Sequence, residues 1–228
     1  KSLDPNDPTA WLYSSLVKKE QNQINEAVSD LQNSQRLNDN RGLFRSRNLL
    51  DQDQAIRAAN LASIYRDAGM TDLSRREASR AVDYDITIPS AHLFLANSYD
   101  TLRDPKQINL RYETPWASEL FLGNLLAPVG AAPLSQNISQ HEYSRLFERS
   151  GFGLSSNTEY TSNGDWQQTA SQYGTFDDFS YSIDVDYRSE LGQRPNNDFE
   201  RYAVWAKAKF NLTEQDSILV QTVYSDYE

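Results

Sequence analysis

Residues 179–188 read FSYSIDVDYR, and every second side chain along them is aromatic or aliphatic. Successive side chains of a β-strand point to opposite faces, so this period of two predicts a strand with one apolar and one polar face. Asp184, Asp186 and Arg188 share the polar face. The segment is therefore the strongest strand signal in the chain.

The same alternation continues in neighbouring segments of about ten residues. Residues 201–212 place Trp205, Lys207 and Lys209 on a polar face, opposite a set of apolar side chains. Weaker alternation marks residues 151–161, 165–174 and 218–225. The second half of the chain is therefore predicted to form five antiparallel strands.

The length of these segments and the position of their aromatic residues indicate the surroundings of the strands. Strands of soluble proteins typically have about 5–6 residues, whereas strands that cross a bilayer need about 9–11. Phe179 and Tyr187 lie near the ends of one apolar face, and Tyr202 and Phe210 near the ends of the next, as in the interfacial belts of outer-membrane barrels. We therefore expect the apolar face to contact lipid.

The polar face would then line a water-filled interior. The pore-lining candidates are Asp184, Asp186, Arg188, Trp205, Lys207 and Lys209. The connections at 174–178 and 213–216 are tight, whereas 191–198 is longer, which places the turns after the second and fourth strands on the periplasmic side. Bacterial barrels start at about eight strands, so we expect an incomplete barrel with at least three strands missing.

The first half carries an internal repeat. Residues 61–65, LASIY, recur as residues 95–99, LANSY, after 34 residues (95 − 61). An earlier copy begins at Pro8-Thr9-Ala10-Trp11, and only the first helix of a third copy, about 89–101, is present. This pattern resembles the tetratricopeptide repeat, a pair of antiparallel helices.

Stacked helix pairs leave a concave surface, lined by the first helix of each pair, that commonly binds peptides or other ligands. The candidate lining residues, by repeat position, are Lys19, Glu20, Arg66, Asp67, Asn97 and Asp100. Their mixed charges favour a polar ligand or an extended peptide. The alternative is that they are ordinary solvated helix faces.

An insertion of 13 residues, near Arg41–Asp53, separates the first two repeats by 47 residues instead of 34. Its arginines, Arg41, Arg45 and Arg47, form a candidate docking site for an acidic partner, because guanidinium groups bind carboxylates with two parallel hydrogen bonds. Alternatively, Asp51 and Asp53 pair with these arginines locally.

The composition excludes several functional classes. The net charge is −10, which disfavours nucleic-acid binding. The absence of cysteine and the presence of only two histidines leave few ligands for a metal and few groups for catalysis, so we expect no cofactor and no enzymatic activity. No apolar stretch approaches the ~20 residues of a spanning helix.

Charge and aromatic content change along the chain. Residues 1–150 have a net charge of −2 (17 basic, 19 acidic) and residues 151–228 one of −8 (5 basic, 13 acidic), and 14 of the 26 aromatic residues lie in the second part. We predict an α+β multidomain protein: helical repeats over 1–102, a linker over 103–150, and the strands of an incomplete outer-membrane β-barrel over 151–228.

Helical repeats followed by EYSRLFER at 142–149 and by Gly151-Phe152-Gly153 resemble a poorly characterised family of Gram-negative outer-membrane proteins. In this family periplasmic repeats are fused to a β-barrel, an architecture similar to that of exopolysaccharide exporters. The resemblance implies an outer-membrane location, a protein partner in the periplasm, contact with outer-membrane lipid, and a polysaccharide as one conceivable cargo.

Three other interpretations stay open at this point. The first is an interaction scaffold that the barrel anchors in the outer membrane. The second is a hydrolase, for which Ser90 with His92, or His141 with Glu142, are the available combinations. The third is a helical repeat domain joined to an ordinary water-soluble sheet. The leading expectation is a channel or exporter whose repeats bind a partner or guide cargo to the pore.

Overall fold

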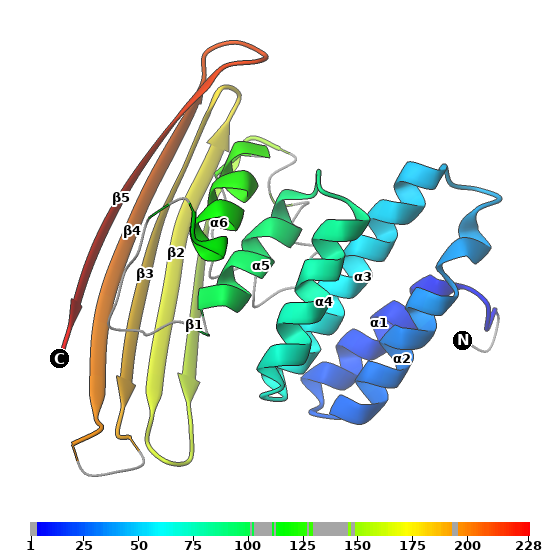
Figure 1. Ribbon diagram of the computed structural model, residues 1–228, viewed down its shortest axis with the longest axis horizontal. Coiled ribbons are helices and arrows are strands. Elements are labelled where there is room, and N and C mark those ends of the chain that lie inside the picture. The colour runs from blue at the N-terminus through cyan, green and yellow to red at the C-terminus, as the bar shows by residue number, and fades with distance from the viewer. Residues whose placement is uncertain are drawn as a thin grey trace. The chain divides into compact units, whose positions relative to one another are not determined.

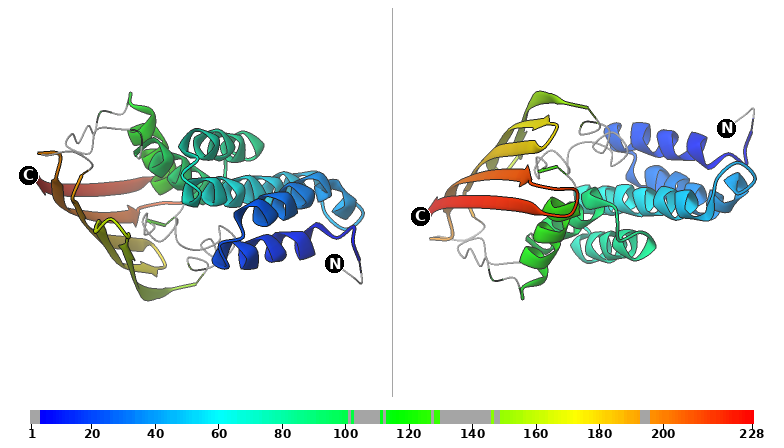
Figure 2. Two further views of the ribbon diagram at one scale, coloured as in Figure 1. Left: turned by 90° about the horizontal axis from the view of Figure 1, so that it is seen from below. Right: turned by 90° about the horizontal axis from the view of Figure 1, so that it is seen from above.

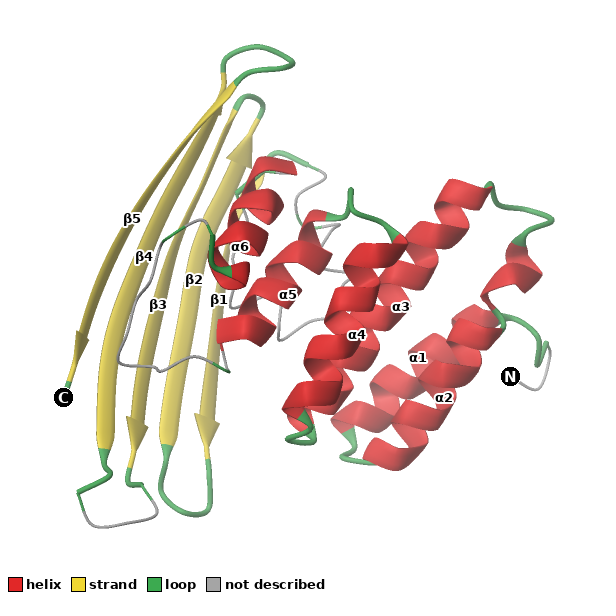
Figure 3. Ribbon diagram, in the orientation of Figure 1, coloured by secondary structure: helices red, strands yellow, loops and turns green. Residues whose placement is uncertain are grey.

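The computed structural model describes residues 4–100, 102, 111, 113–126, 128–129, 146, 149–192 and 196–228. Helices come first along the chain and strands follow, as Figures 1 and 3 show. The helices are α1 (Pro8–Glu20), α2 (Ile24–Arg36), the 3-10 helix η1 (Asn38–Arg41), α3 (Arg47–Asp67), α4 (Thr71–Tyr84), α5 (Pro89–Asp100) and α6 (Pro115–Leu126). The strands are β1 (Gly151–Tyr160), β2 (Trp166–Phe176), β3 (Phe179–Glu190), β4 (Phe199–Asn211) and β5 (Ser217–Tyr227). The predicted α+β class is therefore confirmed.

The described residues divide into two compact units. The first unit contains the helices from α1 to α5 and the part of α6 up to Gly123, and the second contains the described residues from Asn124 onward. The segment predicted as a linker, 103–150, thus contains a helix. Its start has a recognisable signal, because Thr114 Oγ1 accepts a hydrogen bond from the Ala117 N–H at 3.3 Å and Pro115 is the first helical residue.

The helices of the first unit pack around apolar clusters. One cluster joins α1, α2 and α3 through residues such as Leu12, Leu31 and Leu61. Two further clusters join α3, α4 and α5 and consist mostly of alanine, with Phe94 as their largest member. Ala78 and Ala81 of α4 are fully buried. Small side chains therefore let α3 and α4 approach closely.

The turns after α1 and α3 have the same geometry. Gly69 has a φ of +72°, and its N–H bonds the Arg66 carbonyl at 2.8 Å while the Met70 N–H bonds the Tyr65 carbonyl. Asn22, 47 residues earlier, has a φ of +57°. Its N–H bonds the Lys19 carbonyl and the Gln23 N–H bonds the Lys18 carbonyl, which is the same pattern after α1. This is the Schellman motif, which favours glycine or asparagine. The two helix pairs are thus related by the spacing of 47.

The insertion between these pairs folds as η1, a turn and the first turns of α3. The buried Arg57 of α3 holds it in place, because its Nε donates to Ser34 Oγ at 2.9 Å and its Nη1 donates to Asn38 Oδ1. Asn38 in turn donates to the Leu50 carbonyl at 3.1 Å. Burial lowers the pKa of Arg57, which stays charged because arginine titrates far above neutral pH.

The second unit is built on one antiparallel sheet with the strands in chain order, β1-β2-β3-β4-β5. The strands contain 10, 11, 12, 13 and 11 residues, so they are of the longer kind that the sequence predicts. The sheet is open, with β1 and β5 at its edges. Figure 2 shows its curvature from two further directions.

Exposure along the strands is the reverse of that in a water-soluble sheet. Ile183, on the apolar face of β3, is 45% exposed, and Leu154 and Val220 on the same face are exposed as well. On the opposite face Asp184 is only 2% exposed and Lys207 only 5%. The predicted alternation is confirmed, and the face that is covered is the polar one.

Candidate functional site

The centre of the polar face holds a buried ion pair between β3 and β4. Lys207 Nζ lies 3.1 Å from Asp184 Oδ2, and Ser182 Oγ donates to the same carboxylate oxygen at 3.3 Å. The register places Ser182 directly opposite Lys207. Desolvating two charges costs several kcal/mol per ion, which only their mutual attraction and added hydrogen bonds offset. The polar face therefore keeps its charges at a considerable energetic cost.

A second group of charged residues lies on the same face, between the central ion pair and the C-terminal end of β3. Arg201 Nη2 lies 2.6 Å from Asp186 Oδ1, and Gln167 Nε2 donates to the other carboxylate oxygen at 3.0 Å. Arg188 pairs with Glu190 on the same strand. Arg201 and Glu190 are missing from the predicted pore-lining set, although their position in the alternation marks them as members of this face.

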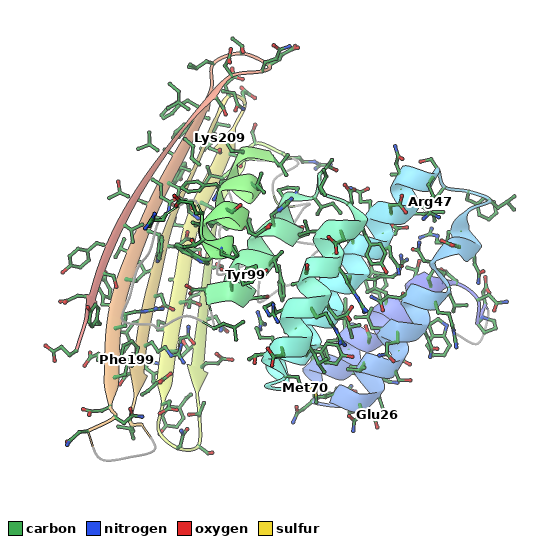
Figure 4. The ribbon with its side chains drawn as sticks, viewed as in Figure 1. Glu26, Arg47, Met70, Tyr99, Phe199 and Lys209 are labelled. Carbon is green, nitrogen blue, oxygen red and sulfur yellow. The ribbon has the colours of Figure 1, made fainter. Side chains whose placement is uncertain are left out.

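The remaining two pore-lining candidates also lie on the polar face. Trp205 is half-buried and has Asp184 and Val223 as its cross-strand neighbours. Lys209 lies near the end of β4, and Figure 4 shows it at the opposite end of the strand from Phe199. All six candidates thus share one face of the sheet.

Several polar atoms of this face are buried and have no hydrogen-bond partner among the described residues. They are Ser171 Oγ, Thr175 Oγ1, Asp184 Oδ1, Arg201 Nε, both side-chain amide atoms of Gln221, and Ser225 Oγ. The register assigns every one of them to the polar face. Each buried unmade hydrogen bond costs about 1–3 kcal/mol. These atoms are therefore suited to contact water or a polar solute.

Aromatic rings form two belts on the apolar face. Phe179 lies directly opposite Phe210, with ring centroids 4.7 Å apart, and Tyr187 lies directly opposite Tyr202. Trp166 extends the second belt, at 5.1 Å from Tyr187. Eight residues separate the belts on β3 (187 − 179), which is about 26 Å at ~3.3 Å per residue. Between the belts lie small and aliphatic side chains such as Ile183, Val185 and Ala206, together with Gln172, Tyr181 and Tyr224.

In the helical unit, the structure brings together part of the predicted concave set. Lys19 Nζ of α1 lies 2.9 Å from Asp67 Oδ2 of α3 and donates to Ser63 Oγ at 2.9 Å. Arg66 bonds Asp67 as well, and its guanidinium carbon lies 5.7 Å from the ring centroid of Phe94 on α5. Helices α1, α3 and α5 are therefore linked by polar and cation–π contacts.

The other three members of the concave set are Glu20, Asn97 and Asp100, which lie outside the group of Lys19, Arg66 and Asp67. Glu20 is exposed at the end of α1, and Asn97 and Asp100 are half-buried on α5. The six residues all lie on the first helix of a pair, as the repeat pattern predicts. The pairing of Lys19 with Asp67 leaves less free charge on this surface than the sequence suggests.

The insertion arginines are mostly satisfied locally. Arg45 pairs with Asp53, Arg47 lies 3.1 Å from Asp51, and Arg41 donates to Thr9 Oγ1 at 3.1 Å. This geometry corresponds to the alternative of local pairing. Figure 4 labels Arg47 at the start of α3.

The most exposed large apolar side chains of the insertion are two residues that were not among the candidates. Leu43 is 85% and Phe44 84% exposed in the turn between η1 and α3. The contacts of Arg45 and Arg57 described above hold this turn in position. In the sequence, the signal for this feature is the pair of adjacent apolar residues, Leu43 and Phe44, among the polar residues of the insertion.

His92 does not have the geometry of a catalytic base. Its Nδ1 lies 2.6 Å from Glu119 Oε2 and its Nε2 lies 2.9 Å from the Ile86 carbonyl, so both ring nitrogens face acceptors. Burial lowers the pKa of His92, but these two hydrogen bonds outweigh it, and the pKa is raised above its ordinary value of 6.5. The ring therefore has no nitrogen left to accept a proton from Ser90. The other combination, His141 with Glu142, lies outside the described residues.

The described part of the chain contains neither a membrane-spanning helix nor a cluster of metal ligands. Its helices include none that is both long and apolar enough to cross a membrane. It also contains no group of three or more His, Cys, Asp or Glu residues that could hold a metal ion. Comparison of the whole sequence with known proteins yields no matching family and no matching curated protein.

Proposed function

We propose that this chain is part of an outer-membrane channel or exporter whose strands cross the bilayer and whose helical unit lies in the periplasm. The observation that carries the proposal is the reversed exposure of the sheet, in which Ile183 is open and Asp184 is covered. Lipid is the solvent that such an apolar face fits, because exposing it to water would cost about 25 cal/mol per Å².

The aromatic belts support the same arrangement. An outer-membrane barrel has an apolar band between two girdles of aromatic residues, and the belts at Phe179–Phe210 and Tyr187–Tyr202 bound a band of this kind on the apolar face of the sheet. The open edges at β1 and β5 need partners in hydrocarbon, since unpaired backbone groups there cost several kcal/mol each. Further strands would supply those partners.

In this arrangement the polar face lines the path of the cargo. The buried pair of Asp184 and Lys207 and the unpartnered amide of Gln221 offer charges and hydrogen bonds to a hydrated solute. Trp205, beside Asp184, has a flat apolar ring on which a sugar can stack. A polysaccharide is therefore one cargo for which the proposal provides a binding group.

The helical unit would bind a periplasmic partner or guide the cargo. Its candidate surface is the group of Lys19, Arg66 and Asp67, which spans the first helices of successive pairs. Such a mixed surface fits a polar or zwitterionic segment better than an apolar one.

Single cysteines test the orientation of the sheet, because the natural sequence contains none. Ile183→Cys and Ser182→Cys place a thiol on neighbouring residues that face opposite ways. After labelling with an environment-sensitive fluorophore in lipid vesicles, the label at 183 should be quenched by lipid-bound quenchers and the label at 182 should not. Equal quenching by a water-soluble quencher at both positions would contradict a lipid-facing sheet.

Ion conductance tests the channel. Lys207→Glu and Lys209→Glu in the full-length protein should shift the ion selectivity toward cations in planar bilayers, because both side chains lie on the polar face. Gln215→Glu, in the exposed turn after β4, is the matched control and should leave the selectivity unchanged. Unchanged selectivity in the two lysine variants would count against a role of this face in conduction.

A second candidate function is an envelope scaffold that the strands merely anchor. The exposed Leu43 and Phe44 favour it, because a firmly held apolar turn is a typical protein contact. Phe44→Ala in the full-length protein should then lower the yield of the cross-linked complex with the partner. Arg47→Ala, in the same insertion, is the control and should leave that yield unchanged. A conducting protein that keeps all its partners after this change would exclude the scaffold as the principal role of this turn.

A further inference from the structure

We propose that residues 124–126 and 128–129 belong to a plug, held on the polar face of the sheet by a docking site that consists of Ser180 and Lys209. The inference rests on the proposed channel and adds a closing device to it. The plug comprises the last turn of α6 and the residues that follow, and it belongs to the same compact unit as the sheet.

Three hydrogen bonds define the docking site. Lys209 Nζ donates to the carbonyls of Asn124 at 3.1 Å and of Leu125 at 2.7 Å. The Val129 N–H donates to Ser180 Oγ at 2.9 Å. Ser180 and Lys209 lie directly opposite each other on β3 and β4. One cross-strand pair therefore binds the segment at both of its ends.

The chemistry of the contact suits a helix end. The last carbonyls of a helix have no partner within the helix and carry partial negative charge, so an ammonium group stabilises them. Asn124, Val129, Ser180 and Lys209 are all buried. The neighbouring Lys207 is engaged with Asp184. Lys209 thus binds the segment with its charged group, through the carbonyls of Asn124 and Leu125.

The site lies at one end of the sheet. Ser180 is the second residue of β3, and Lys209 is the third residue from the end of β4. The turns nearest to it are the tight turn between β2 and β3 and the turn between β4 and β5. These turns are periplasmic in the proposed orientation. In that orientation the plug lies at the periplasmic end of the polar path and closes it there.

A reversible covalent lock tests the docking. The full-length protein carrying Val129→Cys and Ser180→Cys should form a disulfide, because the Val129 nitrogen lies 2.9 Å from the side-chain oxygen that the new sulfur replaces. Adding Lys209→Met should lower the yield of this disulfide about tenfold, through loss of charge-assisted hydrogen bonds. A yield that is low from the start, or that does not depend on Lys209, would overturn the docking site.

Conductance then tests the plug. The oxidised lock should lower the conductance about tenfold relative to the reduced protein, and Lys209→Met alone should raise it. The control lock joins Asn211→Cys to Ser217→Cys, a register pair of β4 and β5 at the same end, and should have no effect on conductance. Conductance that ignores the lock would overturn the plug alone, whereas a protein that never conducts would overturn the channel and the plug together.

Discussion

The helical unit and the sheet distribute their side chains in opposite ways. The helices bury Leu31, Ile64 and Phe94 and keep most charges near the surface. The sheet buries Asp184 and Lys207 and leaves Ile183 open. In the proposed arrangement both regions remove apolar surface from water, the helices by packing against one another and the sheet by contact with lipid. The difference between them is the observation on which the proposed membrane location rests.

The largest effect is expected for the buried ion pair of the sheet. Lys207→Met should cost about 4 kcal/mol of unfolding free energy, because Asp184 stays buried without its partner. Combining it with Asp184→Leu should recover much of that loss, since two apolar side chains replace the pair. A double-mutant cycle in urea measures both. Additive losses would show that the two charges do not interact, and the contrast between the regions would weaken.

The next largest effect is expected on the apolar face. Ile183→Lys should destabilise the folded protein in lipid by about 3 kcal/mol, because the position lies midway between the aromatic belts. Leu212→Lys, on the same face as Ile183 but beyond the belt at Phe210, is the control and should cost less than about 1 kcal/mol. Unfolding titrations in vesicles distinguish the two. Equal and small costs would favour an ordinary water-soluble sheet.

In the helical unit, Arg57→Met should cost about 2 kcal/mol, because Ser34 and Asn38 lose their donor in a buried site. The exposed Arg47 is the matched control, and Arg47→Met should cost less than about 0.5 kcal/mol. Thermal unfolding measures both variants. A small cost at Arg57 would show that the insertion is held in place by other contacts.

The smallest effect concerns pH. The raised pKa of His92 means that its stabilising contribution, about 1 kcal/mol, is fully present below pH 6.5 and is lost as the pH rises through the raised value. The difference in Tm between the natural protein and His92→Gln should therefore shrink from acid to alkaline pH. A difference that is constant over this range would show that the ring does not titrate with its contact to Glu119.

The strands were predictable because side-chain alternation is a local property of the sequence. Residues 179–188 contain both the strand and the identity of its two faces, and the structure agrees with each. The repeat likewise predicts the helix near 89–101, which is α5. The cross-strand partners of Asp184 and Asp186 depend on register, which a single segment does not contain. Sequence reasoning therefore found the faces of the sheet but not its ion pairs.

The candidate sites of the helical unit were less predictable. Repeat position correctly assigned Lys19 and Asp67 to first helices but gave no reason to expect their ion pair. The insertion arginines were predicted as a docking site because of their charge. The structure pairs two of them with nearby aspartates. The exposed side chains of the insertion include Leu43 and Phe44 instead. Helix α6 lies in the segment 103–150, which was predicted as a linker, although Thr114 and Pro115 are residues that commonly start a helix.

The order of the strands has a consequence for how the sheet forms. Every strand pairs only with its neighbour along the chain, so each hairpin closes over a short loop and no distant segment has to be found first. Assembly can then proceed one hairpin at a time. In the proposed outer-membrane setting, such a sheet would enter the bilayer one hairpin after another instead of collapsing in water first.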